Sequence, residues 1–234
     1  MITLKHHQDR GHTQTSWLDS YHTFSFGDYY DPKNLGFSDL RVINDDIVKP
    51  GKGFGTHEHR DMEIITVVLS GALEHKDSMG NGSIIRPGDV QRMTAGSGVT
   101  HSEFNPSDSE LVHLLQIWIL PEKQGLTPSY EQRTFSDEEK QGRWRLIASP
   151  NGNHDSVMVH QDVEVYQTVI TMNESITYNI PKGRKVWLHV ATGIIEMDNQ
   201  VLEAGDGLGI SEPDNRVAIK GLNEQSEILL FNLK

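Results

Sequence analysis

The sequence contains no cysteine among its 234 residues. This absence excludes disulfide bonds, thiolate metal ligands and cysteine nucleophiles. The chain also has no run of about 18 apolar residues, which a membrane-spanning helix would need. The opening residues 1–11 include no apolar stretch of the kind found in a signal peptide. We therefore expect a cytoplasmic protein that makes no contact with membranes.

Positive charge is scarce. Lys and Arg number 21 against 33 Asp and Glu, which gives a formal net charge of −12 and a pI near 5.4. An acidic surface repels phosphate backbones and anionic lipid, so we expect no direct binding to nucleic acid. Hydrophobic residues at 35% of the chain, together with 21 glycines, still suffice for a folded core.

Helical periodicity is almost absent, and short strand patterns separated by turns fill most of the chain. Residues 64–69 are β-branched and apolar, and residues 111–120 form a longer apolar run that predicts a strand buried on both faces. Frequent turns between such segments predict an antiparallel sandwich or barrel. The main exception is Ser136, which is followed three residues later by Glu139. This capping-box pattern predicts the start of one short helix.

The strand pattern occurs twice. Residues 67–71 lead through a hairpin to a Pro-Gly-Asp turn at 87–89, and residues 190–193 lead in the same way to a Gly-Asp-Gly turn at 205–207. The hairpin turn at 79–82 includes Asn-Gly, a pair that tolerates positive φ. The agreement in order and spacing predicts two β-barrels in tandem.

We place the boundary between the barrels in the region of residues 125–145, where Pro and Gly precede the predicted helix. An N-terminal metal-binding barrel over residues 1–133 and a C-terminal barrel over residues 134–234 are expected. The C-terminal half contains neither a His-x-His nor a His-x-Glu pair. We expect it to hold no metal, and we expect His189 to be a buried, hydrogen-bonded core residue.

Two short motifs of the first half offer metal ligands. His57 and His59 are two residues apart, and so are His101 and Glu103. Residues i and i+2 of a strand project from one face, so each pair can reach a single point. Three imidazoles and a carboxylate suit Fe, Mn, Ni, Co, Cu or Zn, and four protein ligands leave two octahedral positions for catalysis. The alternative is two unrelated surface motifs, but the glycine-rich segments before both pairs favour a metal site.

Both motifs belong to longer segments that occur in chain order. These segments are Trp17–Ser20, His22–Phe26, Tyr30–Pro32, Leu40–Asp46, Gly53–Glu63, His75–Gly80 and Met93–Glu103. Over roughly residues 9–133 they resemble the pirin family, a branch of the cupin superfamily, and especially its shorter bacterial members. The resemblance implies tandem cupin (jelly-roll) barrels. It also implies one divalent metal, Fe(II), with His57, His59, His101 and Glu103 as its ligands; Zn, Mn, Ni, Co and Cu remain alternatives.

The carboxylate departs from the wider cupin pattern. There the ligand Glu follows the His pair one position later than Glu63 does, and Ile64 occupies that place. Pirins share this shift and take their carboxylate from the second motif, where Glu103 stands. We interpret Glu63 as a structural or supporting residue and Asn105 as a residue that holds a turn. Structural roles are also the expectation for the remaining histidines of the first half that lie in strand-like segments, namely His22, His75 and His113.

The resemblance implies quercetin 2,3-dioxygenase activity, in which O2 opens the heterocycle of a flavonol and carbon monoxide is released. The partners would be a small planar aromatic substrate and O2. The metal would lower the pKa of the flavonol 3-hydroxyl, and Glu103 would accept its proton as the catalytic base. Two alternatives remain open. One is a metal- or redox-sensing regulatory protein that acts through protein partners, and the other is a cupin enzyme with a different native substrate.

Overall fold

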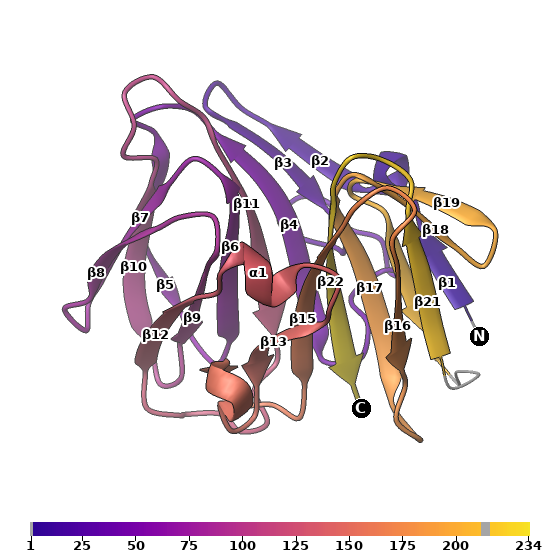
Figure 1. Ribbon diagram of the computed structural model, residues 1–234. Coiled ribbons are helices and arrows are strands. Elements are labelled where there is room, and N and C mark those ends of the chain that lie inside the picture. Colours follow the sequence, from indigo (N-terminus) through magenta and orange to yellow (C-terminus); the bar gives the residue numbers. More distant parts are fainter. Residues whose placement is uncertain (1, 212–215) are drawn as a thin grey trace. The chain divides into compact units, whose positions relative to one another are not determined.

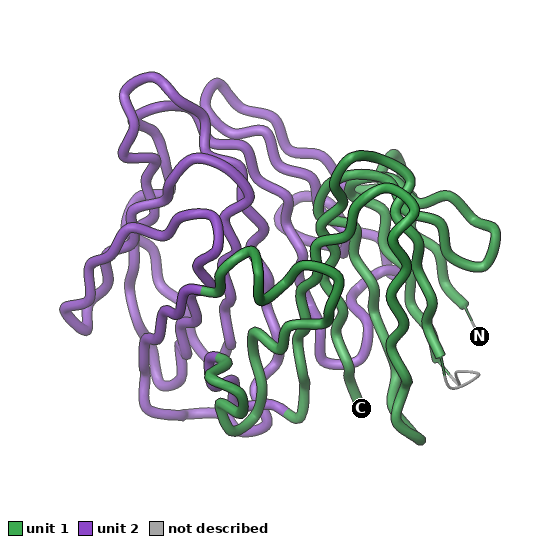
Figure 2. Tube along the Cα trace, viewed as in Figure 1, with its two compact units in different colours: residues 1–10, 135–156, 162–234 green, residues 11–134, 157–161 purple. Residues whose placement is uncertain are grey.

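The computed structural model describes residues 2–211 and 216–234, and their secondary structure is almost entirely β (Figure 1). The chain divides into two compact units (Figure 2). Unit 1 comprises Met1–Arg10, Phe135–Ser156 and Asp162–Lys234, and unit 2 comprises Gly11–Thr134 and Val157–Gln161. Each unit contains a larger and a smaller antiparallel sheet, so the expected all-β architecture is confirmed.

Unit 2 is built from a large sheet with the strand order β12-β9-β6-β11-β4-β3-β2 and a small sheet with the order β5-β10-β7-β8. Its elements are β2 (Gly11–Gln14), β3 (Leu18–His22), β4 (Leu40–Val48), β5 (Gly53–His59), β6 (Glu63–Ser70), β7 (Leu73–Asp77), β8 (Gly82–Ile85), β9 (Asp89–Thr94), β10 (Val99–Phe104), β11 (Val112–Ile119), β12 (Ser129–Thr134) and β14 (Val157–Met158). The long apolar run predicted at 111–120 is β11. It lies between β6 and β4 and is largely buried, as its sequence indicates.

Unit 1 is built from a large sheet that includes the strand order β1-β20-β17-β22-β15-β13 and from a small sheet with the order β16-β21-β18-β19. Its elements are β1 (Ile2–Lys5), η1 (His7–Asp9), α1 (Asp137–Lys140), β13 (Arg145–Ser149), η2 (Asn153–Asp155), β15 (Glu164–Ile170), β16 (Ser175–Asn179), β17 (Lys185–Thr192), β18 (Ile194–Met197), β19 (Gln200–Glu203), β20 (Gly207–Ile210), β21 (Arg216–Gly221) and β22 (Ser226–Leu233). The predicted capping box is confirmed, because the backbone N–H of Ser136 donates to Glu139 Oε2 at 2.8 Å and α1 follows.

The units are not continuous stretches of chain. The first strand, β1, pairs with β20, so that Ile2 faces Ile210 and Lys5 faces Gly207. Directly after it, the backbone N–H of His7 donates to Asp206 Oδ1 at 2.6 Å. These contacts attach the N-terminal segment to unit 1. The proposed domain boundary between residues 133 and 134 stays a prediction, and the compact units differ from it by the segments 1–10 and 157–161.

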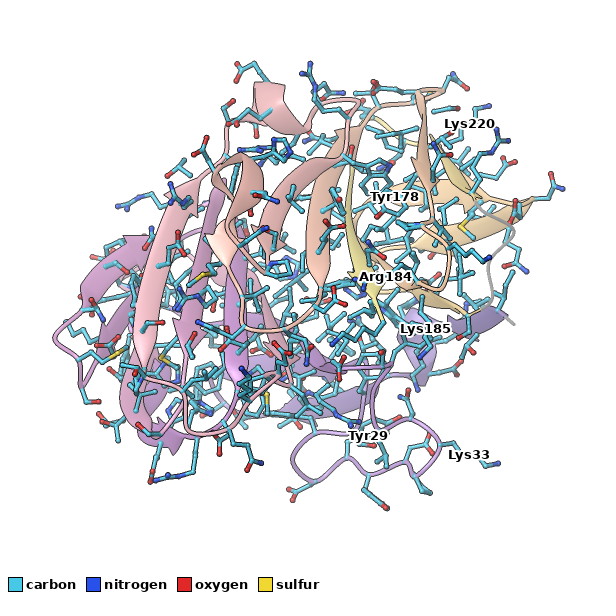
Figure 3. All side chains as sticks on the ribbon, turned by 90° about the horizontal axis from the view of Figure 1, so that it is seen from below. Tyr29, Lys33, Tyr178, Arg184, Lys185 and Lys220 are labelled. Carbon is cyan, nitrogen blue, oxygen red and sulfur yellow. The ribbon has the colours of Figure 1, made fainter. Side chains whose placement is uncertain are left out.

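The core of unit 1 is an apolar cluster that includes Leu188, Ile195 and Leu230. Each side chain of this kind contributes about 1.5–3 kcal/mol when fully buried. Tyr178 belongs to this cluster and is labelled in Figure 3, and its ring lies 5.2 Å from that of the partly buried Tyr166 between centroids. Among the described residues, no helix has the length and apolar character needed to cross a bilayer.

One hairpin turn forms differently from the prediction. The sequence places positive φ on the Asn-Gly pair at 81–82, but the residue with positive φ is Gly80, at 92°. The side chain of Asp77 organises this turn by accepting hydrogen bonds from the backbone N–H groups of Met79 and Asn81. An Asp that bonds backbone two residues ahead imposes its own turn, and this local bond outweighs the preference of the Asn-Gly pair.

Candidate metal centre

Three pairs of polar residues, each spaced i and i+2, lie on three neighbouring strands of the small sheet of unit 2. They are His57 and His59 on β5, His101 and Glu103 on β10, and His75 and Asp77 on β7. β10 lies between β5 and β7 (Figure 1). His101 on β10 faces His57 on one side and Asp77 on the other. Glu103 faces His75 across the β10–β7 pair. Because alternate residues of a strand share a face, the pairing brings all these side chains to one side of the sheet.

The three predicted histidine ligands come together. The ring centroids of His57 and His101 are 4.4 Å apart, and those of His59 lie 4.8 Å from both. Their candidate ligand atoms all lie within 4.8 Å of one another, as metal binding requires. A second group within the same limit contains His75, His101 and Glu103. Glu103 thus reaches the cluster through His101, and His101 belongs to both groups.

A β-bulge and a glycine shape the strand that carries the first pair. Between the facing pairs His101–His57 and Glu103–Phe54, two residues of β5 oppose one residue of β10. Such a bulge redirects side chains and is frequent beside functional sites. At Gly53, a Cβ atom would lie 2.1 Å from the carbonyl oxygen of Glu103. Only glycine therefore allows β5 to approach the ligand strand this closely.

Hydrogen bonds occupy one atom of several candidate ligands and leave another free. His57 Nδ1–H donates to the carbonyl of Gly55 at 2.7 Å, which leaves Nε2 as the ligand atom. Gln116 Nε2 donates to Glu103 Oε2 at 2.9 Å. Three buried atoms have no protein partner, namely His59 Nε2, His101 Nε2 and Glu103 Oε1. Buried polar atoms nearly always have a partner, so this convergence of lone pairs fits a metal ion.

The amide of Gln116 is held in one orientation. The indole Nε1–H of Trp118 donates to Gln116 Oε1 at 3.1 Å. Because an indole N–H can only donate, Gln116 must present its oxygen to Trp118 and its NH2 group to Glu103. The chain Trp118–Gln116–Glu103, which starts on β11 of the large sheet, therefore holds the carboxylate in place.

Burial tunes the protonation states of these groups. Burial lowers the pKa of His101 to about 2, with further lowering by the neighbouring histidines, and it lowers the pKa of His59 to about 4. Both rings are therefore neutral at pH 7, and their lone pairs are available. Burial, reinforced by the nearby Asp46, raises the pKa of Glu103 to about 7. A bound cation would offset this penalty and favour the carboxylate.

A pocket of about 400 Å³ opens beside the cluster, and His57, His59 and Glu103 line it. One part of its wall is aromatic: the ring of Trp118 makes edge-to-face contacts with His59 at 5.0 Å and with Phe26 at 5.4 Å between centroids. Such a wall suits a flat, largely apolar ligand.

Another part of the pocket wall is polar, and it is supplied by Ser20, His22, Asn44 and Asp46. His22 Nδ1 contacts Asn44 Oδ1 at 2.8 Å, and the hydroxyl of Ser20 donates to Asp46. Burial raises the pKa of Asp46 to about 7. A second carboxyl group with a raised pKa therefore faces the same pocket as Glu103.

The loop between β3 and β4 supplies Phe26 to the pocket wall. Tyr29, labelled in Figure 3, belongs to the same loop and packs on the backbone of Gly11, where a Cβ atom would lie 2.3 Å from the tyrosine ring. Ser25 holds the loop closed, because its hydroxyl lies 3.0 Å from the carbonyl oxygens of both Asp31 and Asn34. The aromatic wall is thus positioned by a fastened loop.

The remaining residues singled out in the sequence lie outside the cluster. Glu63 is buried and accepts hydrogen bonds from Thr94 Oγ1 and from the backbone N–H of His160, both at 3.1 Å. Asn105 holds a turn, since its Nδ2 donates to the carbonyls of Val48 and Glu110. The interpretation of Asn105 is confirmed. His189 is buried, as expected.

Sequence reasoning missed several residues that contribute to the cluster or the pocket. His22 was assigned to packing but lines the pocket, and Asp46 and Gln116 were not singled out. The sequence analysis assigns His75 a structural role and gives Asp77 none, although His-x-Asp repeats the spacing of His-x-Glu at 101–103. That shared spacing is the sequence signal that identifies a third pair on the same sheet face.

Comparison with known proteins agrees with this geometry. The family model described as Pirin matches residues 4–119, and the model of the quercetinase C-terminal cupin domain matches residues 146–233. The chain is 47% identical over 233 residues to quercetin 2,3-dioxygenase of Escherichia coli (strain K12), which covers 100% of this chain and 99% of the relative. The chain belongs to the pirin family. The expected tandem cupin fold is thereby confirmed.

A further relative and two solved structures match the chain over its full length. A putative quercetin 2,3-dioxygenase of Pasteurella multocida (strain Pm70) is 44% identical over 234 residues, with coverage of 99% and 98%. The crystal structure of YhhW from Escherichia coli matches with a TM-score of 0.95 at 46% identity, covering 100% of this chain and 98% of that one. The structure of the bacterial pirin YhhW in complex with nickel(II) matches with a TM-score of 0.93 at 46% identity, covering 100% and 99%.

Proposed function

We propose that this pirin is a metal-dependent dioxygenase with quercetin 2,3-dioxygenase-type activity. It would open the heterocycle of a flavonol with O2 and release carbon monoxide. The observation that carries the proposal is that His101 groups with His57 and His59 and also with Glu103, while His59 Nε2, His101 Nε2 and Glu103 Oε1 are buried without a protein partner. His57, His59 and Glu103 also line a pocket with an aromatic wall. The 47% identity to a quercetin 2,3-dioxygenase over the whole chain supports the same reaction.

The proposed metal ligands are His57, His59, His101 and Glu103. One divalent transition metal fits this set of three imidazoles and one carboxylate. Fe(II) is the metal that the family resemblance implies, and nickel(II) is the ion in the complex of the related YhhW. A bound divalent metal supplies Lewis acidity, which lowers the pKa of a coordinated hydroxyl group.

The protein residues would bind, orient and deprotonate the substrate. Gln116 holds Glu103 Oε2, so the unpartnered Oε1 would serve as the ligand atom and, when the carboxylate tilts, would instead accept the proton of the flavonol 3-hydroxyl. Trp118 and Phe26 would hold the flat rings and exclude water. The polar wall around Asp46 offers hydrogen-bond partners for the other hydroxyl groups of a polyhydroxylated substrate.

The test is turnover of quercetin by protein loaded with Fe(II) or Ni(II). The expected result is bleaching of the near-ultraviolet flavonol band together with release of carbon monoxide. His101→Ala and Glu103→Ala should abolish both signals. Glu58→Gln is the matched control, because Glu58 is exposed and lies between the two histidines of β5. Full activity in either ligand variant would refute the site, and no bleaching with any divalent metal would refute the activity.

The regulatory alternative stays a prediction that can be tested separately. It requires a protein partner whose binding changes when the metal is oxidised. A pull-down under reducing and oxidising conditions should recover such a partner in only one of them. The cytoplasmic location and the absence of nucleic-acid binding likewise stay predictions from the sequence.

A further inference from the structure

A buried row of three side chains, Asp77, His75 and the candidate metal ligand His101, begins at the β7–β8 turn. His75 Nε2 lies 3.2 Å from Asp77 Oδ2, and His75 Nδ1 lies 3.5 Å from His101 Nδ1. The side chains of His75 and Asp77 are 0% exposed, and His101 is 2% exposed. These contacts are therefore shielded from water, where hydrogen bonds have their largest effect on orientation.

The first member of the row, Asp77, is held rigidly as a carboxylate. Its Oδ1 accepts from the backbone N–H groups of Met79 at 2.9 Å and of Asn81 at 3.0 Å. Its Oδ2 accepts from Asn81 Nδ2 at 2.9 Å. Burial acts to raise the pKa of Asp77, but hydrogen bonds from Asn81 and His75 outweigh it and leave the pKa below its usual value. Asp77 can therefore only accept a hydrogen bond from His75.

The hydrogen-bonding roles then follow along the row. His75 must carry its proton on Nε2 in order to donate to Asp77, so its Nδ1 bears a lone pair. That lone pair faces Nδ1 of His101, which must carry a proton in order to donate to it. His101 is then left with its lone pair on Nε2, and this is the buried atom without a protein partner.

We propose that Asp77 and His75 are positioning residues that fix the tautomer and the ring orientation of His101, so that Nε2 is presented to the metal. This inference rests on the metal centre of the proposed function. Hydrogen-bonded partners of metal-binding histidines commonly change metal affinity about 10–100-fold. Here a second histidine lies between the carboxylate and the ligand, so the turn at Asp77–Asn81 is coupled to the metal through two imidazole rings.

The competing role for His75 is that of a ligand itself, because it forms a close group with His101 and Glu103. A ligand needs a free lone pair directed at the ion. Nε2 of His75 is engaged by Asp77, and Nδ1 faces the Nδ1 atom of His101. The hydrogen-bonding role therefore uses both nitrogen atoms of His75, and the ligand role would leave Nδ1 of His101 without an acceptor.

The test is a double-mutant cycle of nickel(II) affinity, measured by competition with a chelator. In Asp77→Asn the amide NH2 would donate to His75 Nε2, the proton of His75 would move to Nδ1, and His101 would be driven to carry its proton on the ligand atom Nε2. We expect Asp77→Asn to lower the affinity at least tenfold. In His75→Gln the side-chain oxygen accepts from His101 whatever residue stands at position 77. We therefore expect Asp77→Asn to lower the affinity less than threefold in that background.

Nitrogen-15 NMR of the histidine rings in zinc-loaded protein gives a second readout. In the wild type we expect the proton of His75 on Nε2 and that of His101 on Nδ1, and in Asp77→Asn we expect the proton of His75 on Nδ1. His12→Gln is the matched control, because His12 forms a similar pair with Asp19 at 2.6 Å but lies on β2. It should leave nickel affinity unchanged.

Three results would overturn the proposal. The first is an equal loss of nickel affinity on Asp77→Asn in both backgrounds. The second is an unprotonated Nε2 of His75 in the wild type. The third is a His75→Gln variant that binds nickel as weakly as His75→Leu does. No flavonol enters these measurements. A coupling of the expected size in a protein that does not turn over quercetin would uphold the row and reject the proposed function.

Discussion

Replacing Glu103 with Gln should make the metal-free protein more stable, although it removes a proposed metal ligand. The pKa of Glu103 is raised from its ordinary value of 4.5 to about 7 by burial and by Asp46. The folded state therefore binds this proton more tightly than the unfolded state does. The contribution of Glu103 to stability is present below pH 4.5 and is lost as the pH rises through about 7.

The magnitude follows from the difference between the two pKa values. About 2.5 pH units at about 1.4 kcal/mol each give a cost of about 3 kcal/mol at pH 8, where the buried carboxylate is ionised. Gln has nearly the same shape and carries no charge, and its oxygen can still accept from Gln116. Relative to the wild type, Glu103→Gln should therefore gain about 3 kcal/mol at pH 8 and almost nothing at pH 4.

The assay is urea unfolding of metal-free protein in the presence of a chelator, at intervals from pH 4 to pH 8. Glu58→Gln serves as the control, since Glu58 is exposed on β5 and should change stability by less than about 0.5 kcal/mol at every pH. Nickel(II) at about 1,000 times the Kd of the wild type should reverse the order of stability, because it stabilises the wild type by about 4.1 kcal/mol, whereas the variant lacks the carboxylate ligand. A Glu103→Gln variant that is less stable at pH 8, or equally stabilised at all pH values, would show that the buried carboxylate does not destabilise the metal-free protein.

Three further substitutions test other parts of the structure. Gly53→Ala should lower the free energy of unfolding by about 1–3 kcal/mol in urea, because its Cβ would lie 2.1 Å from the carbonyl oxygen of Glu103. A Cβ at Gly55 would have no atom within 4 Å, so Gly55→Ala should cost less than about 1 kcal/mol. Equal costs for the two variants would contradict this prediction. Gln116→Leu removes the hydrogen bond to Glu103 and should lower nickel affinity about tenfold in chelator competition. Unchanged affinity would show that Gln116 does not position Glu103 for the metal. Asp206→Ala removes the buried acceptor that holds the N-terminal segment and should cost about 1–3 kcal/mol, with faster amide exchange in β1; unchanged exchange would show that the strand is held by its ladder alone.

The local parts of the fold were predictable from the sequence because their causes are local. The apolar run at 111–120 predicted β11, and Ser136 with Glu139 predicted α1. The i, i+2 spacing of His57 and His59 placed both rings on one face of a strand. Each of these inferences depends on side chains a few residues apart, where periodicity and capping act directly.

The parts that were missed depend on which strands become neighbours. β1 joins β20 across about 200 residues, and no local pattern at Ile2–Lys5 indicates that pairing. His75 and Asp77 acquire their role only because β7 lies beside β10. Asp46 enters the pocket through the pairing of β4 with β3 and β11. Strand order of this kind is set by the packing of the whole barrel.

The proposed function requires three imidazoles and one carboxylate of unit 2 to bind a single divalent ion. X-ray absorption spectroscopy of nickel-loaded protein, with the metal content determined on the same sample, tests it most directly. We expect one nickel per chain with three imidazole ligands and at least one oxygen ligand, and loss of one imidazole in His101→Ala. Fewer than three imidazoles in the wild type, or an unchanged spectrum in that variant, would contradict it.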